Sequence, residues 1–490
     1  MKTEYVDVLI VGAGLSGIDA AYHLQKYCPK KTYLILEARE RIGGTWDFFR
    51  YPGIRSDSDM FTMSYNLRPW GSGKNLADGH SIREYITDTA KSGAIDKNIR
   101  FRHKVTHASW STKDALWTIK AVRESDTGEE TIIFKANFLI SCAGYYKYDE
   151  GYTPDFPGKN LFEGLIIHPQ AWPEDLDYAN KRIVVIGSGA TAITLIPALA
   201  KTATHVTMLQ RSPTYIASIP SINENHVQRL QSLSVDEAYI LTRQERINEF
   251  RDLLNSAKSN PEEFKKAIHT ATQKALGELY NPVDFTPSYN PWDQRFCAIP
   301  DNDLFIAMCE GRASIVTDKI EAFTEKGIRL KSGVELKADI IVTATGFNLN
   351  VFGGIELSID GMMLEKSKPF ITYKGVMFLN IPNFAAVRGY TTASWTLKAD
   401  LACFYICRVL DHMDKINARQ VTPRSKEEIV AVKPISNLTS GYLKRAQLNL
   451  MQGDNEPWVY YQDYLKDIAL LKDKPVEDDA LEFSNKPGNT

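Results

Sequence analysis

Hydrophobic positions along the chain fall into two similar patterns, each typical of a strand, a glycine turn and a helix. The first pattern is YVDVLIVGAGLSGIDAAYHL, at residues 5–24, and the second is KRIVVIGSGATAITLIPALA, at residues 181–200. In both, a continuous apolar run precedes the glycines, and apolar residues then recur at helical spacing. A further short apolar run follows each unit, TYLILEA and HVTMLQR. Because dinucleotide folds cross from strand to helix to parallel strand, we expect an α/β protein with two Rossmann-like nucleotide-binding domains.

The pattern changes between residues 220 and 290, where the chain is charged, poor in glycine and helical in period. We predict a helical insertion within the second nucleotide domain. The first domain is then expected at 1–145 and again at 346–490. The second is expected, with the linker, at 146–219 and again at 291–345, on either side of the insertion at 220–290. The last residues, VEDDALEFSNKPGNT, are typical of a frayed acidic tail.

The first glycine turn carries a complete G-x-G-x-x-G motif, made of Gly12, Gly14 and Gly17. The first glycine makes the tight turn, the second admits a pyrophosphate close to the backbone, and the third lets helix and strand pack. Glu37 ends the next apolar run, where a carboxylate can accept hydrogen bonds from a ribose hydroxyl. A carboxylate would repel a 2′-phosphate, so FAD or NAD fits this site and NADP does not. A turn that serves packing alone is the plainer alternative.

The second glycine turn has alanine in place of the third glycine and contains Gly187, Ser188, Gly189, Ala190 and Thr191. Arg211 follows the next apolar run, at the place that Glu37 takes in the first unit. A guanidinium there can bind a 2′-phosphate through paired charge-assisted hydrogen bonds, and Ser212 can add a hydroxyl donor. This exchange of an acid for an arginine predicts FAD at the first site and NADPH at the second. The alternative is an exposed arginine on a loop.

A loop after the first unit, RIGGTWDFFRYPGIRSDSDMF, adds residues to the first site. Gly44 allows close approach of the backbone to a cofactor, and Trp46 can pack against it. Arg55 and Asp57 lie further along the loop, and by spacing alone they would form a solvated surface pair. The full prediction for cofactor binding in and around this unit also includes Ser16, Thr45, Ser56 and Val105.

Arg295 stands in PWDQRFCAIPDNDLF, among aromatic and apolar residues, with Asp293 as a neighbouring acid. A buried arginine in this position could simply donate to backbone carbonyls. It could also serve as a fixed cation for a developing oxyanion. The spacing does not choose between these alternatives.

Composition excludes several other classes of function. The formal net charge is −2 and 43% of the residues are hydrophobic, which argues against a nucleic-acid partner and against disorder. Six cysteines in 490 residues, none in a CxxC motif, form no disulfide framework; Cys403 and Cys407 are expected to be ordinary buried thiols. No metal-ligand spacing, signal segment or transmembrane run is evident. We therefore expect a cytoplasmic protein without a transmembrane segment, with peripheral membrane contact left open.

The segment between the two units, FEGLIIHPQAWP, carries the most specific signal. It resembles the fingerprint F-x-G-x-x-x-H-x-x-x-W-P of the type I flavin-dependent Baeyer–Villiger monooxygenases at Phe162, Gly164, His168, Trp172 and Pro173. GGTW, RYPGIRSDSD and the ATGF near Gly346 are similar to segments of the same family. RYPGIRSDSDMFTMSYN and PWDQRFC look like the branch that contains the bacterial ethionamide-activating monooxygenase.

This resemblance implies an enzyme that uses FAD, NADPH and O₂ to convert ketones to esters or lactones, with sulfides as further substrates. An anionic peroxyflavin would attack the carbonyl. Arg295 would stabilise this anion and the adduct's oxyanion, Asp57 would orient Arg295, and Arg55 and Ser56 would lie near the nicotinamide. His168 would shape domain motion without donating a proton.

Two departures and two alternatives accompany this interpretation. Gln294 stands where the family often has a lysine beside the 2′-phosphate, so preference for NADPH would depend mainly on Arg211. Trp395 is expected either near the substrate pocket or in the core. A related flavin monooxygenase that oxidises sulfur or nitrogen is the nearest alternative, although Trp172 and Pro173 favour the ketone-oxidising family. A flavin reductase that releases peroxide is the alternative from another class.

Overall fold

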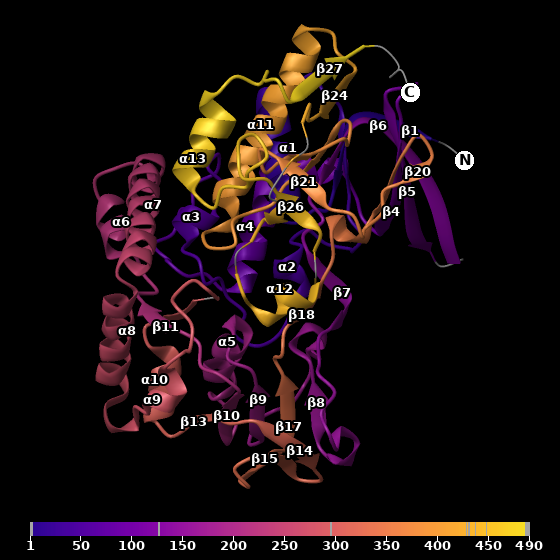
Figure 1. Ribbon diagram of the computed structural model, residues 1–490. Helices are drawn as coiled ribbons and strands as arrows, with labels where there is room; N and C mark the ends of the chain where they lie inside the picture. The colour runs from indigo at the N-terminus through magenta and orange to yellow at the C-terminus, as the bar shows by residue number, and fades with distance from the viewer. Residues whose placement is uncertain are drawn as a thin grey trace.

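The two largest sheets among the described residues are each built around one of the predicted nucleotide units (Figure 1). This computed structural model describes residues 3–125, 128–294, 296–427, 429, 432–436, 438–446 and 448–485. The larger sheet occupies the upper part of Figure 1, and the smaller sheet lies at the bottom. No helix in these ranges combines the length and apolar character that a bilayer crossing requires.

Parallel strands form the centre of the larger sheet, in the order β3 (Ile99–Arg100), β2 (Tyr33–Leu36), β1 (Glu4–Val11), β6 (Gly128–Ser141) and β23 (Phe384–Ala386). The register pairs Val11 with Leu36, so Gly12 and Glu37 leave adjacent strand ends. The outer strands are β4 (His103–Ser111), β5 (Leu116–Ser125), β19 (Glu356–Ile359), β20 (Met362–Met363), β21 (Phe370–Tyr373), β22 (Met377–Phe378), β25 (Lys433–Pro434) and β26 (Leu450–Gln452).

Three helices form one core with this sheet: α1 (Leu15–Tyr27), α4 (Gly79–Ser92) and α11 (Trp395–Lys415). Helix α1 begins directly at the first glycine turn, and its buried residues run from Leu15 to Leu24. Helix α11 packs along α1, although it comes from the far end of the chain. The first nucleotide turn is therefore supported by residues from both ends of the sequence.

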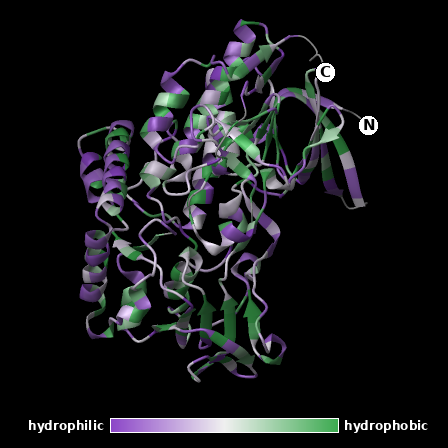
Figure 2. Ribbon diagram, in the orientation of Figure 1, coloured by the Kyte–Doolittle hydropathy of each residue, from purple (hydrophilic) through white to green (hydrophobic). Residues whose placement is uncertain are grey.

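The smaller sheet is parallel, in the order β13 (Ala313–Thr317), β10 (His205–Gln210), β9 (Arg182–Ile186), β17 (Ile340–Thr343) and β8 (Leu165–Ile167). Its strands are the green arrows at the bottom of Figure 2, as expected where helices and loops cover both faces. Helices α5 (Ala190–Leu199) and α10 (Asp303–Cys309) pack with it, and β14 (Ile320–Thr324), β15 (Gly327–Leu330) and β16 (Glu335–Lys337) form a small antiparallel sheet.

The chain crosses between the two sheets in strands that pair with each other. Strand β7 (Tyr146–Gly151) leaves the larger sheet, and β18 (Phe347–Leu349) returns to it in the antiparallel direction. The linker then continues through the 3₁₀ turn η2 (Lys159–Leu161), β8 and the 3₁₀ turn η3 (Pro169–Ala171). This pairing keeps the two crossings side by side.

The charged region at 220–290 is helical: α6 (Glu224–Arg229), α7 (Val235–Ser259), α8 (Pro261–Leu276), the turn η4 (Gly277–Leu279) and α9 (Pro282–Phe285). It follows β11 (Ile216–Ile219), which pairs with β12 (Cys297–Pro300). Helix α7 begins with a capping box in which Ser234 and Glu237 satisfy each other's backbone amides. The insertion was expected to belong to the second domain, but α7 also packs on α3 (Met60–Met63) of the first-domain loop. Arg243 of α7 is buried there beside Asp400, at 3.2 Å.

The expectation of a frayed tail is wrong for part of the C-terminal segment. Strand β27 (Leu481–Ser484) pairs with β24 (Gln420–Pro423), and Leu481 is buried. The hydrophobic residues Leu481 and Phe483 alternate with polar ones, a strand pattern that the acidic composition obscured. The remaining short elements are α2 (Thr45–Phe48), η1 (Ile95–Asn98), η5 (Phe352–Gly354), α12 (Gly441–Ala446), α13 (Tyr464–Ile468) and the π turn η6 (Ala469–Asp473).

Candidate active site

One cavity of about 1160 Å³ lies between the two sheets and is lined by both glycine turns. Gly12 and Gly14 line it from the first unit, and Gly187 and Gly189 from the second. Pockets for one small ligand usually measure about 300–1,000 Å³. The cavity exceeds this range and reaches from one glycine turn to the other.

The first turn leaves no room for a side chain at Gly12 or Gly17. A Cβ on Gly17 would lie 1.8 Å from the carbonyl oxygen of Gly12, and one on Gly12, whose φ is +101°, would lie 2.7 Å from that of Cys142. Gly14 and Gly44 face each other so closely that a Cβ on Gly44 would lie 3.0 Å from the Cα of Gly14. The backbone at this turn is thus exposed to the cavity, as a diphosphate requires.

Glu37 lies at the cavity wall and is held by the backbone. Its Oε2 accepts from the amide of Ala13 at 2.7 Å, and its Oε1 accepts from the amide of Arg39 at 2.9 Å. Burial raises the pKa of Glu37, although these backbone hydrogen bonds favour the carboxylate. The carboxylate is fixed beside the first glycine turn, where ribose hydroxyls of a nucleotide can donate to it.

The second turn is open at its centre. Gly187 has a φ of +138° and is closed off by the carbonyl of Ala344, but a Cβ on Gly189 would meet nothing within 4 Å. The Ser188 hydroxyl donates to the carbonyl of Ser212 at 2.9 Å, which joins the turn to the segment after β10. Arg211 is exposed and lines the cavity, in the position predicted for a 2′-phosphate ligand.

Other residues of the predicted first site also line the cavity: Ser16, Thr45, Trp46 and Val105. The Ser16 hydroxyl accepts from the Trp395 indole at 2.8 Å, and Trp395 stacks on Tyr145 with ring centroids 5.4 Å apart. Trp395 therefore both lines the cavity and packs against the core, and its place near a substrate pocket stays a prediction. Nothing in the sequence indicated that Tyr145 stacks on Trp395.

Arg55, Ser56 and Asp57 line the cavity from the loop between α2 and α3. Arg55 forms an ion pair with Asp303 of α10, at 2.6 Å, which joins this loop to the second domain. The Ser56 hydroxyl donates to the carbonyl of Ser58 at 2.8 Å. Spacing suggested Asp57 as the neighbour for Arg55, and the distant partner Asp303 could not be found from sequence.

Arg295 lies outside the described residues, so its predicted role stays a prediction. Gln294 lines the cavity. The carbonyl of Asp293 accepts hydrogen bonds from the amide and the hydroxyl of Thr439, at 2.8 and 3.0 Å. The segment that leads into α12 is therefore anchored to this loop.

His168 has both ring nitrogens engaged by the backbone. Nδ1 accepts from the amide of Gln170 at 3.1 Å, and Nε2 lies 3.0 Å from the carbonyl oxygen of Gly346. A Cβ on Gly151 would lie 2.0 Å from the ring, so the histidine fills the space beside β7. Burial lowers the pKa of His168. The neutral side chain joins the linker to both crossings between the domains.

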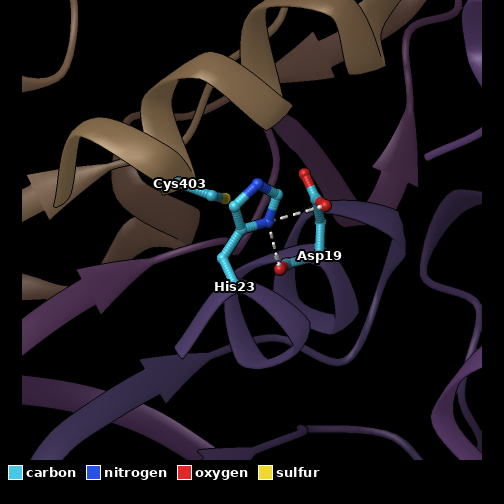
Figure 3. A group of neighbouring side chains, drawn as sticks. All are labelled: Asp19, His23 and Cys403. Carbon is cyan, nitrogen blue, oxygen red and sulfur yellow. Dashed lines mark hydrogen bonds and ion pairs between the residues drawn. The ribbon is translucent and has the colours of Figure 1, made fainter. Parts of the chain in front are cut away.

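A buried polar cluster lies behind the first turn, on α1 and α11 (Figure 3). The Nδ1 atom of His23 lies 3.2 Å from the carboxylate of Asp19, and the Cys403 sulfur is close to both side chains. Asp400 lies 4.0 Å from His23 Nε2 and also accepts from Arg243. Two acids and two cationic side chains thus face one another, which neither the motifs nor the spacing indicated.

Relatives from several bacteria match nearly the whole chain. It is 48% identical over 487 residues to the putative FAD-containing monooxygenase MymA of Mycobacterium tuberculosis, covering 98% of each. It is 48% identical over 488 residues to the FAD-containing monooxygenase EthA of the same species, covering 99% of each. The probable FAD-binding monooxygenase AlmA of Acinetobacter baylyi is 47% identical, with 99% of this chain and 97% of the relative covered.

Solved structures share the fold. An oxidized steroid monooxygenase bound to NADP has a TM-score of 0.75 at 22% identity, covering 98% of this chain and 99% of its own. An open crystal structure of cyclohexanone monooxygenase has a TM-score of 0.74 at 20% identity, covering 99% and 100%. The predicted α/β fold with two Rossmann-like domains is confirmed.

The flavin-binding monooxygenase-like family matches residues 6–431. This match and the relatives above confirm the resemblance drawn from FEGLIIHPQAWP and the glycine turns, and with it an oxidoreductase that uses a flavin. The chain belongs to the flavin-binding monooxygenase-like family.

Proposed function

We propose that this enzyme is an FAD-, NADPH- and O₂-dependent Baeyer–Villiger monooxygenase that converts ketones to esters or lactones and also oxidises sulfides. The observation that carries the proposal is the single cavity lined by both glycine turns. A reducing nucleotide and a flavin bound to these turns would meet in the same cavity. The Baeyer–Villiger enzymes among the fold neighbours support the choice of ketones.

The residues at the first turn suit FAD. Gly12 and Gly17 have no space for side chains, and Glu37 presents a fixed carboxylate to a ribose. At the second turn, open Gly189 and cavity-lining Arg211 suit NADPH. When bound and reduced, the flavin supplies the activation of O₂.

The protein's own residues would exclude water from the cavity and would supply a positive charge to stabilise the reacting oxygen. Trp395, Tyr145 and Tyr146 line the cavity with aromatic surface, which limits access of water to a charged species. We propose that Arg295 stabilises the negative charge that develops on oxygen, since a guanidinium stays charged at every working pH. Asp57 lines the cavity and would orient this guanidinium.

His168 would position the two domains and would transfer no proton. Its two ring nitrogens are already engaged by Gln170 and Gly346. We also propose a cytoplasmic location, since the six cysteines are free thiols.

Product analysis with ¹⁸O₂ tests the proposal. The FAD-loaded enzyme receives NADPH with a linear ketone, a cyclic ketone or an aryl methyl sulfide, and products are measured by mass spectrometry. We expect an ester or lactone that carries one labelled oxygen, and a loss of about 10²–10³ in rate for Arg295→Ala. Arg329→Ala is the matched control, because Arg329 is exposed on β15 and does not line the cavity.

Sulfoxide as the sole product, still formed by Arg295→Ala, would overturn the ketone assignment in favour of a sulfur- or nitrogen-oxidising flavin monooxygenase. NADPH consumption with hydrogen peroxide as the sole product would indicate a flavin reductase instead.

A further inference from the structure

A buried ion pair lies behind the loop that joins β23 to α11. Lys398 of α11 donates from Nζ to Oδ1 of Asp467 at 2.6 Å, and both side chains are fully buried. Asp467 belongs to α13, which packs on α11 (Figure 1). Replacement of a buried ion pair by apolar residues is often neutral or stabilising, so stability alone does not account for a pair in this position.

The pair holds two consecutive residues of that loop. Asp467 Oδ2 accepts from the Tyr390 hydroxyl at 2.6 Å. Lys398 Nζ also lies 4.8 Å from the centre of the Tyr460 ring, and the Tyr460 hydroxyl donates to the carbonyl of Gly389 at 2.9 Å. One lysine therefore fixes Gly389 through an aromatic ring and Tyr390 through a carboxylate.

The loop that the pair holds supplies part of the cavity wall. Tyr390, Ala393 and Trp395 all line the cavity. A Cβ on Gly389 would lie 2.4 Å from the Trp395 indole, so the loop backbone packs against this ring. The Tyr390 hydroxyl is bound by buried Asp467, and the surface that Tyr390 offers to a ligand is therefore its ring.

A second group of the same composition lies away from the cavity. Lys374 pairs with Asp478 at 2.8 Å, and the Tyr373 hydroxyl donates to the same carboxylate at 2.6 Å. None of these three described residues lines the cavity. The two Lys–Asp–Tyr groups thus differ in whether the tyrosine reaches the cavity.

We propose that Lys398 is a positioning residue that fixes Tyr390 as an apolar wall for the carbon skeleton of the substrate. The inference rests on the proposed function, which makes this cavity the place where a ketone or sulfide is oxidised. A fixed wall limits the orientations in which a substrate presents its reacting atom, so it determines both affinity and product selectivity. The ligand is a ketone or sulfide whose apolar part packs against an aromatic ring.

Kinetics and product selectivity of Lys398→Met test the inference, because methionine fills similar space without a charge. The substrates are linear methyl ketones of increasing length, an unsymmetrical cyclic ketone and an aryl methyl sulfide. We expect KM to rise about fivefold to fiftyfold while kcat changes less than about threefold, since ground-state binding is lost. The ratio of regioisomeric esters or lactones and the enantiomeric ratio of the sulfoxide should each change at least about threefold.

A titration without turnover accompanies the kinetics. The same ketones and sulfide are added to the oxidised, FAD-loaded protein, and flavin absorbance reports their Kd. We expect Kd to rise in Lys398→Met by about the same factor as KM. Thermal unfolding and flavin content of each variant show whether the fold and the first site are intact.

Lys374→Met is the matched control, because it breaks the same kind of ion pair at a place that does not line the cavity. It should leave KM, Kd and both product ratios within about twofold of the native values. Tyr390→Phe keeps the ring and the buried ion pair but removes the hydroxyl, and it should shift the ratios in the same direction as Lys398→Met. The double variant should shift them no further, because both changes act through one chain of contacts.

Two results would overturn the inference. Equal changes in Lys398→Met and Lys374→Met would assign the effect to stability. Unchanged product ratios and Kd in Tyr390→Phe would show that the tyrosine is no wall for the substrate, and this variant decides the matter where Lys398→Met does not fold.

The outcome is distinct from that of the proposed function. Sulfoxide as the sole product, with an enantiomeric ratio that changes in Lys398→Met, would support the positioning role and refute the ketone assignment. Ester formation with unchanged regioisomer ratios and KM in Lys398→Met and Tyr390→Phe would do the reverse. Where no oxygenated product forms, the flavin titration decides, and an unchanged Kd in Lys398→Met overturns the inference.

Discussion

His168 and Gly346 are joined by a hydrogen bond of 3.0 Å from the imidazole Nε2 to the backbone carbonyl. The amide of Gln170 donates to the other ring nitrogen, so Nε2 must carry the proton. This bond connects the fingerprint segment to the chain that returns to the first domain, directly before β18. The neutral His168 side chain therefore connects, through hydrogen bonds, two segments that cross the domain boundary.

Replacement of His168 should slow turnover without changing the pH dependence of turnover. We expect His168→Ala to lower kcat by roughly tenfold to hundredfold, because small displacements of reacting groups are costly. The free energy of unfolding should fall by about 1–3 kcal/mol, since two part-buried backbone groups lose their partner. The measurements are steady-state kinetics across pH 6–9 and denaturant unfolding.

His80→Ala serves as the control, because His80 is exposed on α4. A kinetic pKa near 6.5 that is present in the native enzyme and absent from His168→Ala would contradict the structural role. It would show that His168 exchanges a proton during turnover.

Local sequence patterns predicted those parts of the site that are formed by residues of a single segment. Gly17 can be placed because G-x-G-x-x-G requires its close contact with Gly12, and Arg211 because it directly follows a strand. Contacts between distant segments left no such signal. Arg55 pairs with Asp303, and β27 pairs with β24, only because the completed fold brings these segments together.

Alanine at two glycines should separate the two nucleotide sites. Gly17→Ala places a Cβ 1.8 Å from the carbonyl oxygen of Gly12, so the turn must open and FAD should be lost. Gly189→Ala meets nothing within 4 Å, and its φ of −79° suits alanine, so the fold and the flavin should be retained. The new methyl group would then stand where the pyrophosphate of NADPH approaches, and Kd for NADP⁺ should rise at least about tenfold.

Flavin content by absorbance and NADP⁺ titration check both variants. Full retention of FAD by Gly17→Ala would contradict the packing argument. Unchanged NADP⁺ affinity in Gly189→Ala would show that the nucleotide does not approach the second turn closely.

The ion pair between Arg243 and Asp400 should fasten the helical insertion to the first domain. Arg243 is 5% exposed and donates to the carbonyls of Phe61 and Ser64 as well as to Asp400. Arg243→Met leaves a buried carboxylate and two carbonyls without this donor, which should cost about 3–5 kcal/mol of unfolding free energy. Denaturant unfolding measures the loss.

Arg251→Met, at an exposed residue of the same helix, should change the unfolding free energy by less than about 0.5 kcal/mol. A double-mutant cycle with Asp400→Asn gives the energy of the pair itself. A loss of less than about 1 kcal/mol in Arg243→Met would mean that α7 is not held through this arginine.

Stability at alkaline pH should depend on His23, at the centre of the buried cluster. Burial alone would lower the pKa of His23, but the charge of Asp19, its hydrogen bond and the charge of Asp400 outweigh it and raise the pKa to about 9. Because the folded state holds the proton more tightly than the unfolded state, the stabilisation is fully present below about pH 6.5 and is lost as pH rises through about 9. On this basis the native protein should lose on the order of 3 kcal/mol of unfolding free energy between these limits.

His23→Gln should be less stable at pH 6 but should lack this loss, whereas His80→Gln should keep it. Thermal and denaturant unfolding at pH 6, 7.5 and 9.5 would show the difference, and parallel pH profiles for the native protein and His23→Gln would mean that His23 is neutral in the fold.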